Sequence, residues 1–190
     1  MGLLGEGITE VIATTRNNAA PIGIINRDGV LRVVLFHGSH TSENVARDNW
    51  LVANFTFDPV VYVRTAFSDL PLDAFAEEVV EGTHMHRLKE TEAWVAFRTE
   101  VERDGSESVV VRLTPLSEKT LDLRFHPVNR GFAGIIEATV HATRYVHNHD
   151  PWLGKLIEHH ASLVRRCGSA REQEALAMLM EYTGEIYSIQ

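Results

Sequence analysis

The hydrophobic pattern of this chain changes its period about two thirds of the way along, and this change restricts the fold more than any other feature. Up to about Phe125, apolar residues fall in short β-branched runs bounded by turn residues, a pattern typical of strands. After Pro127, apolar positions recur about every 3.6 residues, a pattern typical of helices. We therefore expect an α+β chain, mainly β, with a β-barrel domain at residues 1–125 and a helical C-terminal lobe at residues 126–190.

Seven runs in the first part predict strands. Asp28-Gly29 and Asp104-Gly105 each stand between strand-like segments and predict hairpin turns with positive φ. Short strands at this spacing favour an antiparallel barrel or sandwich. The predicted strands are ITEVIATT from Ile8, APIGIIN from Ala20, VLRVVLFH from Val30, WLVANFTF from Trp50, VVYVRTAF from Val60, AWVAFRTEVER from Ala93 and ESVVVRLTP from Glu107.

Three helices are expected in the second part. The second of them begins with Asp150 as N-cap and ends at Gly168. The third begins at Ser169, where Glu172 completes a capping box. The first starts at Arg130, and its buried side is expected to contain Phe132, Ile135, Ile136, Thr139, Val140 and Thr143.

Composition excludes several classes of function. The net charge of −8 argues against general nucleic-acid binding, because phosphate neutralisation needs a basic surface. No run approaches the roughly 18 to 20 apolar residues of a membrane span, and the first residues lack the pattern of a signal peptide. We therefore expect a cytoplasmic protein with no membrane partner. The single cysteine, Cys167, excludes an internal disulfide and a cysteine-based zinc site within one chain.

The segment LFHGSHTSENV, residues 35–45, predicts an anion site. An apolar strand runs into Gly38, and a group of small donors then precedes a short predicted helix. Backbone N–H groups at a helix N-terminus, together with hydroxyls, bind phosphate groups well. The alternative interpretation is that Thr41 or Ser42 only caps the helix. The segment has no Walker-type lysine and no GxGxxG pattern, so it does not indicate a nucleotide-triphosphate or dinucleotide site.

Ten histidines raise the question of a metal site. On a helix, His141, His147 and His149 do not share a face, because residues on one face stand three or four positions apart. His159 and His160 point in directions about 100° apart. We therefore expect no functional metal site and interpret these histidines as solvated residues at helix ends and in loops.

Four short motifs in this order resemble the FMN-binding split-barrel superfamily of flavin reductases and pyridoxamine-phosphate oxidases. The chain looks most similar to the flavoproteins grouped as domain of unknown function 447. The resemblance extends over nearly the whole chain, helical lobe included. The motifs are NAAPIG at Asn18–Gly23, FHGSHTSENV at Phe36–Val45, NFTFDP at Asn54–Pro59 and NRGFAGIIEATVHATR at Asn129–Arg144.

This resemblance implies a homodimer of six-stranded split barrels with FMN near the subunit interface. It implies that the strand beginning at Asn18 runs beside the isoalloxazine ring, and that Pro21 keeps its edge open. An edge-strand proline that blocks aggregation is the alternative for Pro21. Arg16 or Arg32 would add positive charge near the phosphate. The implied cofactor-binding residues are Arg16, Asn18, Ala19, Ala20, Pro21, Ile22, Ser39, His40, Thr41, Ser42 and Asn44.

Three hypotheses on function follow. The first is a flavin-dependent oxidoreductase that passes hydride or electrons between a reduced cofactor and a small molecule. The second is a flavin-binding carrier or sensor without turnover. The third is a split barrel that binds another ligand such as haem, with His37, His40 or His126 as axial ligands. A shared fold does not separate these hypotheses, because one barrel supports many functions.

Overall fold

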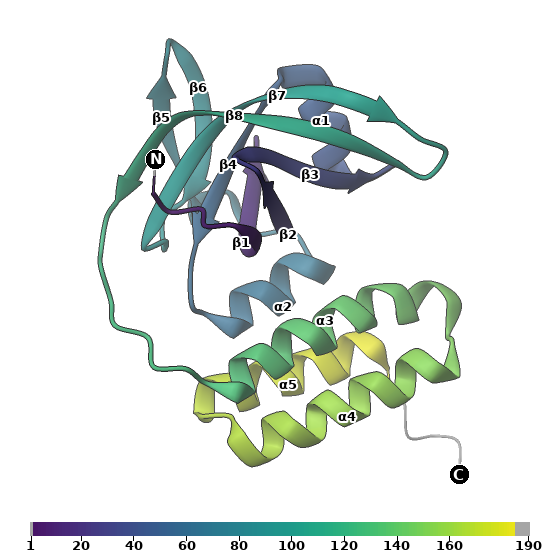
Figure 1. Ribbon diagram of the computed structural model, residues 1–190. Coiled ribbons are helices and arrows are strands. Elements are labelled where there is room, and N and C mark those ends of the chain that lie inside the picture. The colour runs from purple at the N-terminus through teal and green to yellow at the C-terminus, as the bar shows by residue number, and fades with distance from the viewer. Residues whose placement is uncertain (1, 185–190) are drawn as a thin grey trace. The chain divides into compact units, whose positions relative to one another are not determined.

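The computed structural model describes residues 2–184 and divides the chain into two compact units (Figure 1). The first unit consists of the residues up to Thr56 together with Asp69–Arg124. The second consists of Phe57–Ser68 together with the residues from Phe125 onward. The division at residue 125 stays a prediction for the domains, and helix α2 (Pro59–Phe67) belongs to the second unit although it precedes that point. In the described part of the chain, no helix is both long and apolar enough to cross a membrane.

The first unit is a closed barrel of six antiparallel strands in the order β1-β2-β3-β8-β7-β4, which confirms the predicted fold class. Alternate residues point into the core: Val33 and Leu35 are buried, whereas Val34 and Phe36 between and after them are exposed. The strands are β1 (Gly7–Thr15), β2 (Asn18–Arg27), β3 (Val30–Phe36), β4 (Trp50–Phe55), β7 (Ala93–Asp104) and β8 (Ser108–Thr120).

Most of one edge of β2 is unpaired, although the barrel is closed. This strand pairs with β1 from Asn18 to Asn26 but with β3 only over Ile25–Arg27. From Leu31 onward β3 pairs instead with β8 on its other side. The β2 edge from Asn18 to Ile24 is therefore unpaired on the β3 side among the described residues. Helix α1 (His40–Asp48) follows β3 and packs against β1, β2 and β3.

The two Asp-Gly turns differ. Asp28 and Gly29 have φ values of 54° and 74°, so the predicted positive-φ hairpin turn is confirmed. The hairpin at Asp104-Gly105 also forms, but neither residue is among those with positive φ. That expectation was wrong because the loop between β7 and β8 runs from Gly105 to Glu107 and has three residues rather than two.

A second hairpin was not predicted. Strands β5 (Phe75–Val80) and β6 (Thr83–Leu88) form a two-stranded sheet after the single turn η1 (Leu72–Ala74). Charged residues interrupt the apolar alternation in this part of the sequence. The hairpin turn uses Glu81 and Gly82 with φ values of 48° and 78°, and Glu-Gly is a weaker turn signal than Asp-Gly.

The second unit contains α2, α3 (Arg130–Asn148), α4 (Pro151–Cys167) and α5 (Ala170–Thr183). The strand predicted from Val60 is wrong, because this segment is α2. Its valines favour a strand, but Asp58 accepts a hydrogen bond from the Val60 N–H at 3.0 Å and Pro59 occupies the first turn. The same Asp-Pro signal correctly predicted the start of α4, where Asp150 is the N-cap.

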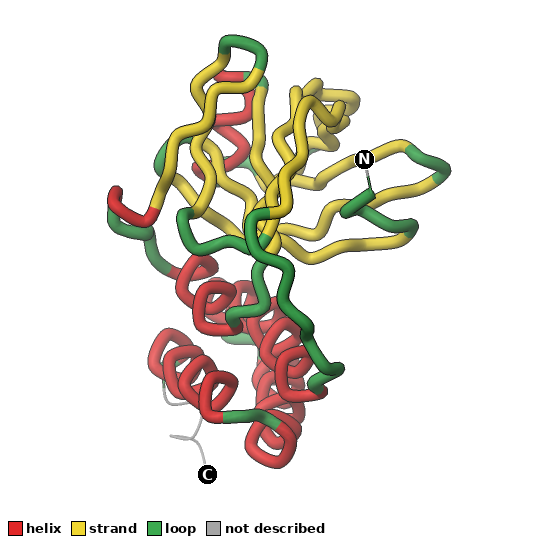
Figure 2. Tube along the Cα trace, turned by 90° about the vertical axis from the view of Figure 1, so that its left-hand side faces the viewer, coloured by secondary structure: helices red, strands yellow, loops and turns green. Residues whose placement is uncertain are grey.

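Small residues dominate the buried side of α3. Helix α3 packs along α4 (Figure 1), and Figure 2 shows the helices of the second unit in red. Ile135 and Thr139 are buried as predicted, whereas Val140 is 39% exposed. The buried face of α3 therefore differs from the predicted one: it contains the small residues Gly131, Gly134, Ala138 and Ala142 in place of Val140. The close packing requires glycine: a Cβ on Gly131 would lie 2.5 Å from the Cα of Gly168. The predicted capping box of α5 is confirmed, since Glu172 accepts from the Ser169 N–H at 2.7 Å.

Candidate anion and cofactor site

A pocket of about 370 Å³ lies where the β1–β2 turn meets the N-terminus of α1, and we call it the α1 pocket. Four residues that the sequence predicted for cofactor binding line it, namely Arg16, Asn18, His40 and Asn44. The remaining lining residues are Asn17, Glu43, Asp69, Leu70 and Leu72.

Helix α1 begins beside this pocket. Gly38 has a φ of 74°, which turns the chain from β3 into the helix, and a Cβ there would meet nothing within 4 Å. The glycine is therefore required by its backbone conformation and not by a close approach. Ser39 is the N-cap: its Oγ accepts from the Ser42 N–H at 3.2 Å and donates to the Phe36 carbonyl at 2.8 Å.

The capping role therefore belongs to Ser39 and not to Thr41 or Ser42, the two residues that the sequence suggested as caps. Both of these are buried in the first turn of the helix. Neither they nor Ser39 line the α1 pocket. The amides at the start of a helix have no intrahelical acceptor, so the His40 and Thr41 N–H groups remain suited to an anion.

Thr41 is tied to the start of β2. Asn18 Nδ2 donates to Thr41 Oγ1 at 2.9 Å. Because the hydroxyl oxygen accepts this bond, the hydroxyl hydrogen stays available for an acceptor. Asn44 connects the same helix to β1, because its Nδ2 lies 3.2 Å from Thr15 Oγ1, while its Oδ1 accepts from Arg47.

Arg16 occupies the turn between β1 and β2 with a φ of 51°, which is uncommon for a residue other than glycine. Its Nε and Nη2 donate to the two carboxylate oxygens of Asp48 at 2.6 and 2.8 Å. The hydrogen bond from Arg16 lowers the pKa of Asp48 below its ordinary value. A guanidinium has five N–H groups, so this pair leaves three for a ligand.

His86 on β6 supports the same turn. Its Nδ1 lies 2.8 Å from the carbonyl oxygen of Arg16, so Nδ1 carries the hydrogen. His86 is not among the implied cofactor-binding residues, because its contact with Arg16 depends on the β5–β6 hairpin, which the residue pattern does not predict. Arg32, the other arginine considered for the phosphate, instead pairs with Glu102 at 2.5 Å and does not line the α1 pocket.

The first part of β2, which has small side chains, forms the unpaired strand edge. Ala19 is buried, and Ala20, Pro21 and Ile22 are half-buried. Pro21 pairs with Ile12 of β1, and no strand among the described residues pairs with its other side. None of these four lines the α1 pocket, which they adjoin through Asn18.

The charge of the α1 pocket is mixed. Arg16 contributes a cation that Asp48 partly neutralises, and the carboxylates of Glu43 and Asp69 also line the pocket. An anion is therefore favoured on the side of Arg16, Asn18 and the first helical amides. Near the two carboxylates it would be repelled.

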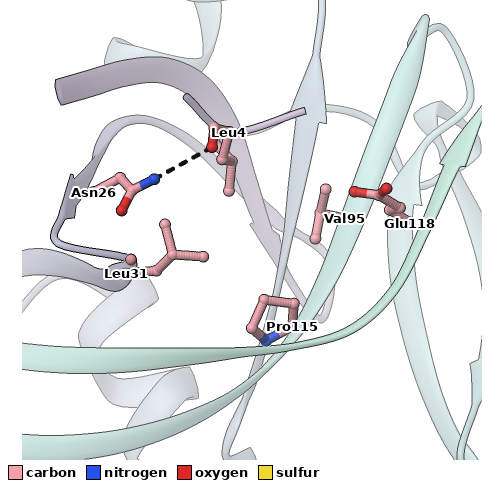
Figure 3. A pocket seen from close by; sticks show the side chains of 7 residues that line it. Leu4, Asn26, Leu31, Val95, Pro115 and Glu118 are labelled. Carbon is pink, nitrogen blue, oxygen red and sulfur yellow. Dashed lines mark hydrogen bonds between the residues drawn. The ribbon is translucent and has the colours of Figure 1, made fainter. Parts of the chain in front are cut away.

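A second cavity of about 400 Å³ lies in the first unit (Figure 3). Its lining is mainly apolar and includes no basic side chain. Its polar lining residues are Asn26 and Glu118, and the buried oxygens Asn26 Oδ1 and Glu118 Oε2 have no hydrogen-bond donor in the described residues. The side-chain nitrogen of Asn26 donates to Leu4, as the figure shows. Two unpaired acceptors disfavour a phosphate, so the α1 pocket is the better anion site.

Two of the three histidines considered as haem ligands have other contacts. His37 Nε2 lies 2.9 Å from the Gly105 carbonyl oxygen and 3.1 Å from Asp104 Oδ1. His126 stacks on Phe57 with ring centroids 3.9 Å apart. His40 alone of the three lines the α1 pocket. The contacts of His37 and His126 do not favour axial ligation of haem by these two residues.

A closed six-stranded barrel in which most of one β2 edge is unpaired, joined in one chain to a helical unit, is the fold of a split-barrel protein. The chain belongs to the family described as "Protein of unknown function (DUF447)": the N-terminal domain of that family matches residues 9–122 and its second domain matches residues 129–181. This confirms the family resemblance seen in the four sequence motifs.

Solved structures include a similar protein. The FMN-bound DUF447 protein MM1853 from Methanosarcina mazei is 40% identical, with a TM-score of 0.89 over 94% of this chain and 96% of that chain. Flavoredoxin from Methanosarcina acetivorans is 14% identical, with a TM-score of 0.47 over 64% of this chain and 72% of that one. The flavin reductase HpaC complexed with NADP+ is 11% identical, with a TM-score of 0.48 over 63% and 83%. Neither of the last two similarities carries weight for activity.

Proposed function

We propose that this protein binds FMN, with the phosphate in the α1 pocket and the isoalloxazine ring along the open edge of β2. The observation that carries the proposal is the convergence of N–H and O–H donors from Arg16, Asn18 and the first turn of α1 beside an unpaired strand edge. The 40% identity to an FMN-bound protein over nearly the whole chain supports it.

The residues fit a phosphate ester. Phosphate oxygens accept hydrogen bonds, and the three N–H groups that Arg16 does not give to Asp48 are charge-assisted donors. The His40 and Thr41 amides add neutral donors at the positive end of the helix dipole. The Asn18–Thr41 bond leaves a hydroxyl hydrogen beside these amides.

The β2 segment fits a flat ring. Its backbone is unpaired from Asn18 to Ile24 on one side, which leaves amide and carbonyl groups free for the polar edge of a heterocycle. Ala19 and Ala20 carry little bulk, and Pro21 removes one donor and fixes φ. These residues would hold and orient the ring and exclude water from one of its sides.

FMN, when bound, supplies hydride and single-electron transfer. We infer an oxidoreductase of the cytoplasm that passes hydride or electrons between a reduced cofactor and a small-molecule substrate. The chain's own part is to bind the phosphate, to present backbone groups to the ring and to limit access of water. Purified protein should carry a yellow flavin that heating releases as FMN.

Anaerobic addition of NADH or NADPH separates two hypotheses. An oxidoreductase that uses a nicotinamide loses its flavin absorbance and regains it with an electron acceptor. FMN-loaded protein that no reduced nicotinamide or deazaflavin bleaches would support the carrier or sensor hypothesis instead. A Soret band in the purified protein, or no binding in an FMN titration, would contradict flavin binding itself.

We also infer a homodimer. Val34 and Phe36 on the outer face of β3 are 42% and 62% exposed, and an exposed apolar pair of this kind is suited to a subunit interface. Both residues lie at the end of β3, shortly before α1 begins at His40. A partner subunit on this face would therefore lie near the N-terminus of α1. Sedimentation velocity tests this inference.

A further inference from the structure

Three side chains with metal-binding groups converge on two helices of the second unit. Glu137 and His141 stand four residues apart on α3, and His160 lies on α4. One ligating atom from each, a carboxylate oxygen and two imidazole nitrogens, lie within 4.8 Å of one another. The two imidazole rings have centroids 5.5 Å apart.

The packing of α3 on α4 explains this convergence. A Cβ on Gly134 would lie 3.1 Å from Val164 Cγ2 and 3.5 Å from the carbonyl oxygen of His160. Because Gly134 has no side chain, the backbone of α4 approaches α3 at the turn that holds His160. Glu137 and His141 follow Gly134 on α3 by one and two helical turns, so their side chains reach across to His160.

One atom of this cluster has no hydrogen-bond partner. His141 Nδ1 is buried and contacts no donor or acceptor among the described residues. A buried polar atom without a partner costs free energy, and such atoms are few in folded proteins.

We propose that Glu137, His141 and His160 bind a zinc ion that joins α3 to α4. Two imidazoles and one carboxylate are the ligand set of many zinc sites, whereas calcium and magnesium prefer oxygen ligands. Ligand atoms around tetrahedral zinc are roughly 3.3 Å apart, so small side-chain rotations close the observed set around the ion. Three protein ligands leave a fourth position for water.

This site differs from the expectation of no functional metal. Along α3 alone, His141 shares no face with His147 or His149, and the third ligand comes instead from the next helix. The pair His159 and His160 supplies one ligand only. His159 is exposed and its ring lies edge-on to that of His160, with centroids 5.3 Å apart, but it is not among the three residues whose ligating atoms converge.

The test uses full-length protein without a histidine tag. Equilibrium dialysis against zinc, followed by metal analysis, should give one zinc per chain in the wild type. Cobalt substitution should give a ligand-field absorption band typical of tetrahedral or five-coordinate geometry, at wavelengths beyond those of flavin. H160Q and H141Q should each lose the band and bind zinc at least about tenfold more weakly.

H159Q is the matched control, because it removes the adjacent imidazole from the same helix and should keep both signals. Circular dichroism confirms that each variant is folded, and zinc should raise the melting temperature of the wild type and of H159Q only. No stoichiometric zinc in the wild type would overturn the proposal. Equal zinc binding by the wild type and a folded H160Q would overturn it as well.

Discussion

Asn18 Nδ2 donates a hydrogen bond to the Thr41 hydroxyl at 2.9 Å, joining the first residue of β2 to the first turn of α1. These residues stand 23 positions apart and belong to two different sequence motifs. The bond holds the start of β2 beside the N-terminus of α1. The proposed ring site on β2 and the proposed phosphate site at α1 are therefore fixed relative to each other.

Thr41→Val should weaken FMN binding by about tenfold, because valine keeps the shape of threonine but loses the hydroxyl. The dissociation constant is measured by quenching of flavin fluorescence. Thr99→Val is the control: Thr99 is also buried and its Oγ1 has no partner in the described residues, but it lies on β7 and not in the first turn of α1. The control should bind FMN like the wild type, and equal losses in both variants would argue against a specific role of Thr41.

The Arg16–Asp48 pair should make stability depend on pH in the acid range. The pKa of Asp48 is lowered in the folded protein, so its contribution is fully present above the ordinary aspartate value of 3.8 and is lost as the pH falls below it. The difference in free energy of unfolding between the wild type and Asp48→Asn should therefore shrink as the pH drops below about 3.8. Urea unfolding at a series of pH values measures this, with Asp73→Asn, an exposed change on η1, as the control. A difference that does not change with pH would contradict the assignment.

Gly131→Ala should lower the free energy of unfolding of the second unit by about 1–3 kcal/mol. The new Cβ would lie 2.5 Å from Gly168 Cα and 2.8 Å from its nitrogen, and backbone atoms cannot move aside easily. Gly134→Ala is the graded comparison, because its nearest atom is a side-chain methyl at 3.1 Å and alanine also favours the helix. Denaturant unfolding, followed by circular dichroism, should give a clearly lower free energy of unfolding for Gly131→Ala than for Gly134→Ala. The reverse order would contradict the described packing.

Phe36→Asp should weaken the inferred dimer strongly, since it places a charge on the exposed apolar pair of β3. Sedimentation velocity over a range of concentrations should show a dimer for the wild type and mainly a monomer for the variant. Val79→Asp, at a residue 61% exposed on the β5–β6 hairpin, serves as the comparison. A monomeric wild type would contradict the inference.

Local signals in the sequence predicted most of the barrel and all three C-terminal helices. The strands around Asp28-Gly29 and the caps at Asp150 and Ser169 were predicted because turn and capping residues act on their immediate neighbours. Helix α2 was missed since valine-rich composition favours strands, whereas tertiary packing and the Asp58-Pro59 start decide for a helix.

The site was only partly predictable for a different reason. The order of the sequence motifs predicts that Asn18 and His40 bind the same cofactor, and both residues line the α1 pocket. The partners of Arg16 depend on chain folding over long separations: Asp48 comes from the end of α1 and His86 from an unpredicted hairpin. The Glu137–His141–His160 cluster likewise needs the contact between two helices, which no single-helix pattern contains.

The most direct test of the central claim compares FMN with riboflavin, which has the same ring and lacks the phosphate. Titration of flavin-free wild-type protein should give a dissociation constant at least about tenfold lower for FMN, because the phosphate gains charge-assisted hydrogen bonds. Arg16→Ala should reduce that ratio while leaving riboflavin binding unchanged. Equal affinity of the wild type for FMN and riboflavin would contradict a phosphate site in the α1 pocket.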